Sequence, residues 1–231
     1  MFPKASEWYL EVDLGHAIVE SGADRSKLFL TSKLHPRDLG ESATLAAFPR
    51  SLERLHTTYL DSFMLHYPRC FGDLCHGKVE ADGDWRGSWR ALEALYERGV
   101  VRAIGVCNFG ADELRELLVF ARVRPHLVQS WMDPLQQARP LRAVCDEADI
   151  TFQAYSSLGT QHRTPVNPVL RHPTIARIAA AVGHSTAQVA LRWALQRGAA
   201  VIPRSTRRAH MQANLALWDF ELSPEQMAEI D

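Results

Sequence analysis

Residues 101–108 read VRAIGVCN, a short apolar run that ends in a polar side chain. Runs of roughly 4–8 apolar residues are typical of a strand buried on both faces, as in a parallel sheet. The residues before this run place an apolar helix face ahead of Gly99, at Trp89, Leu92, Leu95 and Tyr96. The residues after it repeat the helical periodicity, at Leu114, Leu117, Leu118 and Ala121. The stretch therefore predicts a helix–strand–helix unit of an α/β protein.

Five further runs of the same kind flank this unit, at residues 28–33, 60–66, 126–129, 150–155 and 199–203. Helical patterns lie between them, and the first helix is predicted over residues 11–21 with Leu14 and Ile18 facing inward. Ser-x-x-Gln spacings at residues 185–188 and 223–226 predict capping boxes at two more helix starts. Strands that alternate with helices predict parallel βαβ units in a single domain over residues 1–231.

The strand count leaves two α/β architectures open. A closed (β/α)8 barrel has eight strands, whereas an open doubly wound sheet can be built from six. No Gly-x-Gly-x-x-Gly follows any of the predicted strands, and this weakens the dinucleotide-fold alternative. We expect the barrel, with its first strand–helix–strand portion lacking from residues 1–231.

Composition limits the classes of partner. Lys and Arg number 26 and Asp and Glu 27, so the net charge is 26 − 27 = −1, which favours neither nucleic acid nor an anionic membrane. The longest apolar stretches are too short to span a bilayer. The four cysteines contain no CxxC pair, and no signal peptide is seen at the N-terminus. Reduced thiols in a cytoplasmic protein are the simplest interpretation.

Each predicted strand ends in a polar or ionisable residue: Lys33, His66, Asn108, Gln129, Tyr155, and the pair Arg204 and Ser205. In β/α barrels the active site lies at the carboxyl ends of the strands, so six such ends make a candidate site. Taken singly, Lys33 is equally well a surface lysine, and His66 and Tyr155 are more simply core residues. Arg204, Arg207 and Arg208 suit a phosphate or form a solvated turn.

These residues resemble an aldo-keto reductase from about Glu11 to the C-terminus. The resemblance is carried by several motifs in order: LFLTSKL at 28–34, SLERL at 51–55, LHYP at 65–68, RAIGVCNF at 102–109, AYSSLG at 154–159 and VIPRS at 201–205. The family implies a (β/α)8 barrel that binds NADPH and reduces aldehydes or ketones to alcohols.

Within this resemblance, Lys33 and His66 match two of the four catalytic residues, which are Asp, Tyr, Lys and His. The other matches would bind the cofactor: Asn108, Gln129, Tyr155, Ser156, Leu158, Arg204, Ser205 and Asn214. Cys107 stands where serine is usual, Arg204 replaces a common lysine, and His210 lies near the position of an arginine that favours NADPH.

The N-terminus departs most from the family. Counting back from Gly15 places Trp8 at the position of the catalytic tyrosine and Pro3 at that of the aspartate. Tyr9, one residue away, is the nearby candidate acid. We therefore expect an NADPH-dependent carbonyl reductase with impaired turnover. The alternatives are an inactive member that binds NADP(H) or a protein partner, and an aldolase-like barrel in which Lys33 forms a Schiff base.

Overall fold

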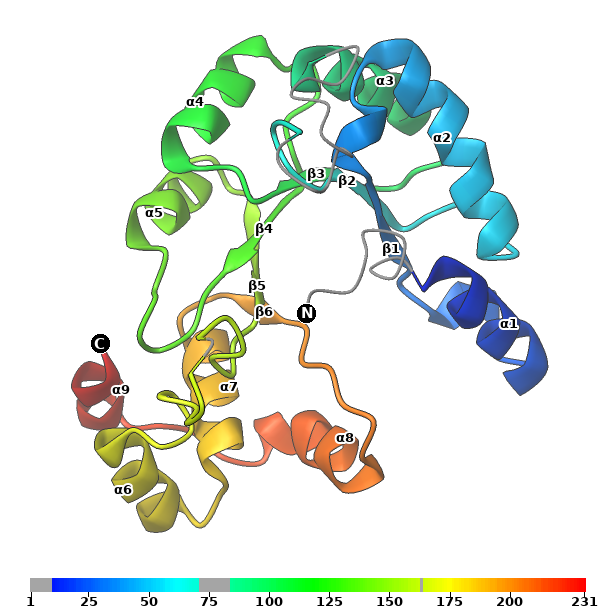
Figure 1. Cartoon of the computed structure of the whole chain (residues 1–231). Helices are drawn as coiled ribbons and strands as arrows, with labels where there is room; N and C mark the ends of the chain where they lie inside the picture. Colours follow the sequence, from blue (N-terminus) through cyan, green and yellow to red (C-terminus); the bar gives the residue numbers. More distant parts are fainter. Residues whose placement is uncertain (1–9, 71–83, 163) are drawn as a thin grey trace. The chain divides into compact units, whose positions relative to one another are not determined.

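A computed structural model describes residues 10–70, 84–162 and 164–231. The chain forms two compact units, one ending at Val128 and one running from Gln129 to Asp231. Six strands, β1 to β6, follow one another in a single sheet in the order of the sequence (Figure 1). The strand count and the alternation with helices are confirmed. No helix in the described ranges is long and apolar enough to cross a membrane.

The first unit alternates helices with parallel strands. Its elements are α1 (Glu11–Ser21), β1 (Thr31–Leu34), α2 (Glu41–Arg54), β2 (Ser62–Leu65), α3 (Trp85–Glu97), β3 (Ile104–Cys107), α4 (Ala111–Phe120) and the start of β4 (Leu127–Trp131), with short 3-10 helices η2 (Arg25–Lys27) and η3 (Pro36–Asp38). In the register, Leu34 lies opposite Leu65, and Leu65 opposite Val106. All four residues of β2 and of β3 are buried, as expected of strands covered on both faces.

The second unit continues the alternation. After β4 it contains α5 (Arg139–Glu147), β5 (Thr151–Tyr155), α6 (Pro173–Val182), α7 (Thr186–Gln196), β6 (Ala200–Val201), α8 (Arg208–Leu215), η5 (Ala216–Trp218) and α9 (Pro224–Ile230). β5 pairs with β6 in parallel. Both predicted capping boxes are confirmed, with Ser185 at the start of α7 and Ser223 at the start of α9.

Helix α1 has its predicted bounds, but the predicted inward face is wrong in part. Ile18 is half-buried, whereas Leu14 is 44% exposed, and the buried residues are Glu11 and Gly15. A Cβ atom on Gly15 would lie 2.1 Å from the carbonyl oxygen of Arg54 at the end of α2. The helix therefore meets α2 through the residue without a side chain, because only glycine allows two backbones to approach so closely.

The cysteines depart from the prediction of reduced thiols. Cys70 is disulfide-bonded, whereas Cys107 and Cys145 are buried thiols. Burial raises the pKa of the Cys145 thiol to about 12. Reactivity of a cysteine depends on its thiolate, so this free cysteine is expected to be unreactive near neutral pH.

Candidate active site

Three of the predicted site residues lie at the ends of neighbouring strands in the first unit. Lys33 belongs to β1, His66 follows β2 directly, and Asn108 follows β3 directly. The backbone N–H of His66 donates to the carbonyl oxygen of Leu34 at 3.2 Å, which continues the parallel ladder one residue past β2. Since parallel strands end at one edge of a sheet, the structure brings these side chains together as predicted.

His66 is a neutral imidazole over most of the pH range. Burial, with smaller contributions from the positive charges of Lys33 and His35, lowers its pKa from 6.5 to about 3. Its ring is tilted against that of Tyr67, with ring centroids 4.7 Å apart. A neutral imidazole both donates and accepts hydrogen bonds, so His66 can orient a carbonyl compound without carrying charge.

Asn108 adopts a left-handed backbone conformation, with φ of 59°. Its Nδ2 donates to the carbonyl oxygen of His66 at 3.0 Å and to Sγ of Cys107 at 3.3 Å. Burial raises the pKa of Cys107 to about 12, so its sulfur is a protonated thiol. The side-chain amide of Asn108 is thus oriented by the two neighbouring strand ends, and no local sequence pattern predicts its hydrogen bond to His66.

In the second unit, Gln129 is buried in the middle of β4, which continues to Trp131. The prediction that a strand ends at Gln129 is therefore wrong. Its Nε2 donates to Oε1 of Gln153 on β5 at 2.5 Å. The apolar run stops at Gln129, but the strand continues past it, because the amide of this buried residue finds a partner on the adjacent strand.

Tyr155, Ser156 and Leu158 lie at the end of β5 and in the turn after it, and all three are half-buried. Ser156 has φ of 55°, and its Oγ accepts a hydrogen bond from Nε2 of Gln161 at 3.1 Å. The carbonyl oxygen of Leu158 accepts from Nδ2 of Asn167 at 2.8 Å. The turn that follows Tyr155, the last residue of β5, therefore has a defined conformation.

Arg204 and Ser205 lie between β6 and α8, where the sequence predicted a helix start. Arg204, Arg207 and Arg208 are exposed, and the N–H of Arg207 donates to Oγ of Ser205 at 3.1 Å. Helix α8 begins at Arg208, and Asn214 is half-buried in its last turn. The guanidinium groups and the helix N-terminus together form a donor set that suits a phosphate.

A hydrogen-bonded cluster around Asp133 in the second unit was not predicted from the sequence. The buried carboxylate of Asp133 accepts from Nε1 of Trp131 at 2.8 Å, from the N–H groups of Leu135 and Gln136 at 2.7 and 3.0 Å, and pairs with Nε2 of His162 at 3.1 Å. The pair Asp133-Pro134 signals a turn. His162 is 29 residues away, however, and nothing in the local pattern connects the two.

The predicted acid Tyr9 and its neighbour Trp8 lie outside the described residues. In the described part of the chain, no group of three or more His, Cys, Asp or Glu side chains could hold a metal ion.

The low pKa of His66 predicts a pH-dependent stability. Below about pH 6.5 the unfolded chain binds a proton on this imidazole, and the folded chain does not until about pH 3. The free energy of unfolding therefore falls as the pH is lowered from 8, and at pH 5 this imidazole has reduced it by about 2 kcal/mol. Urea unfolding across this range should show a shallower pH slope for His66→Gln than for the wild type. The exposed control His210→Gln should keep the wild-type slope, and equal slopes for all three proteins would contradict the burial of a neutral imidazole.

Comparison with known proteins identifies related enzymes. Residues 6–231 match the model of the Aldo/keto reductase family. Glyoxal reductase of Bacillus subtilis is 39% identical over 221 residues, which are 96% of this chain and 74% of that enzyme. The 9,11-endoperoxide prostaglandin H2 reductase of Trypanosoma cruzi is 38% identical over 221 residues, which are 96% of this chain and 73% of that enzyme.

Solved structures of aldo-keto reductases also resemble this chain. An aldo/keto reductase from Brucella melitensis superposes with a TM-score of 0.83 at 35% identity, over 95% of this chain and 79% of that chain. A Bombyx mori aldo-keto reductase in complex with NADP gives a TM-score of 0.85 at 28% identity, over 95% and 73% of the two chains. The expected fold class, the α/β barrel of TIM type, is confirmed by these likenesses.

Proposed function

The chain belongs to the aldo/keto reductase family, and from that membership we propose that it is an NADPH-dependent reductase of small aldehydes or ketones. The relatives are named reductases, among them one of glyoxal. The observation that carries the proposal for this chain is the neutral His66 beside the cation of Lys33, at the ends of adjacent strands. This combination suits the binding of a carbonyl group. Its oxygen can accept a hydrogen bond from the neutral imidazole, and Lys33 is the one cation of the pair.

The described residues have separate roles in this proposal. His66 donates a hydrogen bond to the carbonyl oxygen and orients it. Lys33 supplies a positive charge that stabilises the oxygen as negative charge develops there. Tyr67, in contact with the His66 ring, has a pKa raised by burial and stays a neutral phenol. These groups position the substrate and lower the energy of the developing alkoxide.

The chain also has residues that fit the cofactor. Asn108 and Gln129 provide side-chain amides for a carboxamide, and Tyr155 provides a ring for stacking. Ser156 and Leu158 lie beside Tyr155, and Arg204, Ser205 and Asn214 lie near α8. The cluster of guanidinium groups at the start of α8 supports a phosphate-bearing cofactor in particular. NADPH, when bound, supplies the hydride for the carbonyl carbon.

Arg204 is expected to distinguish NADPH from NADH. The two cofactors differ by the 2′-phosphate, and a guanidinium–phosphate contact contributes about 1.5–3 kcal/mol. Arg204→Ala should therefore weaken NADPH binding by about 10-fold or more and leave NADH binding within about 2-fold, as measured by cofactor fluorescence titration. An equal loss for both cofactors would remove Arg204 from the phosphate site.

We also propose that turnover of this chain is slow. Counting back from Gly15 without a gap places Trp8 at the position of the family's tyrosine, and an indole N–H is a far weaker acid than a phenol. General acid catalysis typically contributes about 10²–10⁴-fold. The test measures the rate of NADPH oxidation with glyoxal for the wild-type chain and for Trp8→Tyr. A rise in kcat of at least 10-fold in the variant supports the proposal. Equal, rapid turnover would instead show that Tyr9 or another group is a competent acid.

The same assay separates the alternative function. A folded chain that binds NADPH but forms no alcohol, with or without Trp8→Tyr, would be a binding protein and would contradict the reductase proposal. Trapping of a substrate on Lys33 by borohydride would indicate Schiff-base chemistry instead.

A further inference from the structure

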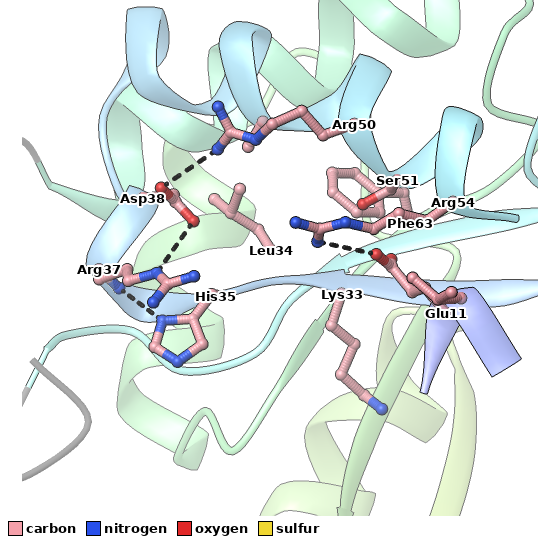
Figure 2. Close-up of a pocket in the computed structure, with 12 residues that line it drawn as sticks. Glu11, Lys33, Leu34, His35, Arg37, Asp38, Arg50, Ser51, Arg54 and Phe63 are labelled. Atoms are coloured by element: carbon pink, nitrogen blue, oxygen red, sulfur yellow. Dashed lines mark hydrogen bonds and ion pairs between the residues drawn. The ribbon is translucent and has the colours of Figure 1, made fainter. Parts of the chain in front are cut away.

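The first unit contains a cavity of about 280 Å³ between β1, η3 and α2, closed at one end by the start of α1 (Figure 2). Its floor is apolar, formed by Leu34, Ala47 and Phe63. Its rim carries three arginines: Arg37 from η3, and Arg50 and Arg54 from α2. A volume just below the range of about 300–1,000 Å³ for drug-sized ligand sites suits a small organic molecule.

This cavity is separate from the candidate active site. Successive side chains of a strand point to opposite faces of the sheet. Leu34 lies under the cavity, whereas the side chain of Lys33 points away from it, to the other side of β1 (Figure 2). The cavity is therefore on the helix-covered face of β1. Lys33 belongs to its lining because it lies in this strand, but its side chain does not point into the cavity.

The positive charges at the rim are only loosely paired. Arg37 and Arg50 share Asp38, with N···O distances of 3.7 and 3.6 Å. Arg54 reaches the buried Glu11 at 3.4 Å, while the other oxygen of Glu11 accepts the hydroxyl of Ser32 at 2.5 Å. Hydrogen bonds from N–H to oxygen usually measure about 2.7–3.2 Å. In the described ranges, no carboxylate therefore takes a short hydrogen bond from these three guanidiniums.

The rim has a charge excess that an anion would relieve. Three guanidiniums face two carboxylates, and Arg50 and Arg54 lie one helical turn apart on α2. Like charges at this spacing destabilise a helix. Asp38 orients two of the guanidiniums without using their remaining donors, which leaves the forked N–H groups available for oxygens of a ligand.

We propose that this cavity binds a small organic phosphate, with its phosphate at the arginine rim and its carbon skeleton on the apolar floor. A phosphate has several acceptor oxygens. It can therefore accept hydrogen bonds from both Arg37 and Arg50, the two arginines that share Asp38. The site is distinct from the arginines around α8, and it does not depend on the proposed reductase activity.

Isothermal titration calorimetry with phenyl phosphate tests the proposal. The wild type is expected to bind this probe, and phenol, which lacks the phosphate, at least 10-fold more weakly. Arg50→Gln and Arg37→Gln should each weaken phenyl phosphate by about 10-fold, since each removes a charge-assisted contact. Both side chains are about half exposed, so neither variant is expected to impair folding, and thermal melts verify this.

Two controls locate the binding. Arg115→Gln removes an exposed arginine of α4 and should keep wild-type affinity for phenyl phosphate, whereas Arg204→Ala reports any binding of the probe at the other cluster. The proposal is overturned if the probe does not bind at millimolar concentration, or if phenol binds equally well. It is also overturned if affinity is lost in Arg204→Ala but kept in Arg37→Gln and Arg50→Gln.

Discussion

Lys33→Met is expected to lower kcat for glyoxal reduction at least about 10²-fold, while the Kd for NADPH stays within about 3-fold. Burial has the largest effect on the pKa values of His66 and Cys107, and the lysine charge also acts on both groups in the direction of a lower pKa. Its removal takes away the positive charge that we assign to the developing alkoxide, and methionine keeps the aliphatic volume. Stopped-flow turnover and cofactor titration separate the two quantities.

The exposed Lys27 provides a matched control for this substitution. Lys27→Met should retain wild-type kcat, because the residue lies in η2 before β1. If Lys33→Met reduced glyoxal at the wild-type rate, Lys33 would be a structural or surface lysine, as its sequence context alone also allowed.

Asp133→Ala is expected to lower the free energy of unfolding by at least about 3 kcal/mol. The side chain is fully buried and satisfies two backbone N–H groups, an indole N–H and an imidazole. Alanine removes the carboxylate acceptor from the Trp131 indole, the Leu135 N–H and His162, while the Gln136 N–H keeps the backbone carbonyl of residue 133. A donor left unsatisfied away from water costs about 1–3 kcal/mol. Urea unfolding monitored by circular dichroism measures the loss.

Asp133→Asn and Asp219→Ala complete this experiment. Asparagine keeps one acceptor oxygen but places an amide NH2 group beside other donors. The loss of unfolding free energy for Asp133→Asn should therefore be intermediate. Asp219 is exposed, and its replacement should change stability by less than about 0.5 kcal/mol. A loss below about 1 kcal/mol for Asp133→Ala would show that water or neighbouring groups satisfy the donors.

Local signals predicted much of the fold. Capping boxes at Ser185 and Ser223 marked helix starts correctly, because the chemistry of a cap lies within four residues. The face of α1 was predicted wrongly because hydrophobicity favoured Leu14, whereas the approach of the Arg54 backbone selected Gly15. That contact joins residues far apart in the sequence, and no local pattern contains it.

The candidate site was predictable to a similar degree. Polar residues after apolar runs identified Lys33, His66 and Asn108, since parallel strands end together. Gln129 was misplaced because its partner Gln153 lies on another strand and lets β4 continue past it. The Asp133 cluster escaped notice for the same reason, as it depends on His162 in a distant loop. Roles for these residues in catalysis and cofactor binding stay predictions.

The most direct test of the central claim follows the hydrogen that is transferred. The purified chain is incubated with glyoxal and NADPH deuterated at C4, on the face from which transfer occurs, and the alcohol is analysed by mass spectrometry. We predict one deuterium on the carbinol carbon for each NADPH consumed, and labelled alcohol formed at least about 10²-fold more slowly by Lys33→Met. A folded chain that binds NADPH but yields no deuterated alcohol, even with Trp8→Tyr, would contradict the account.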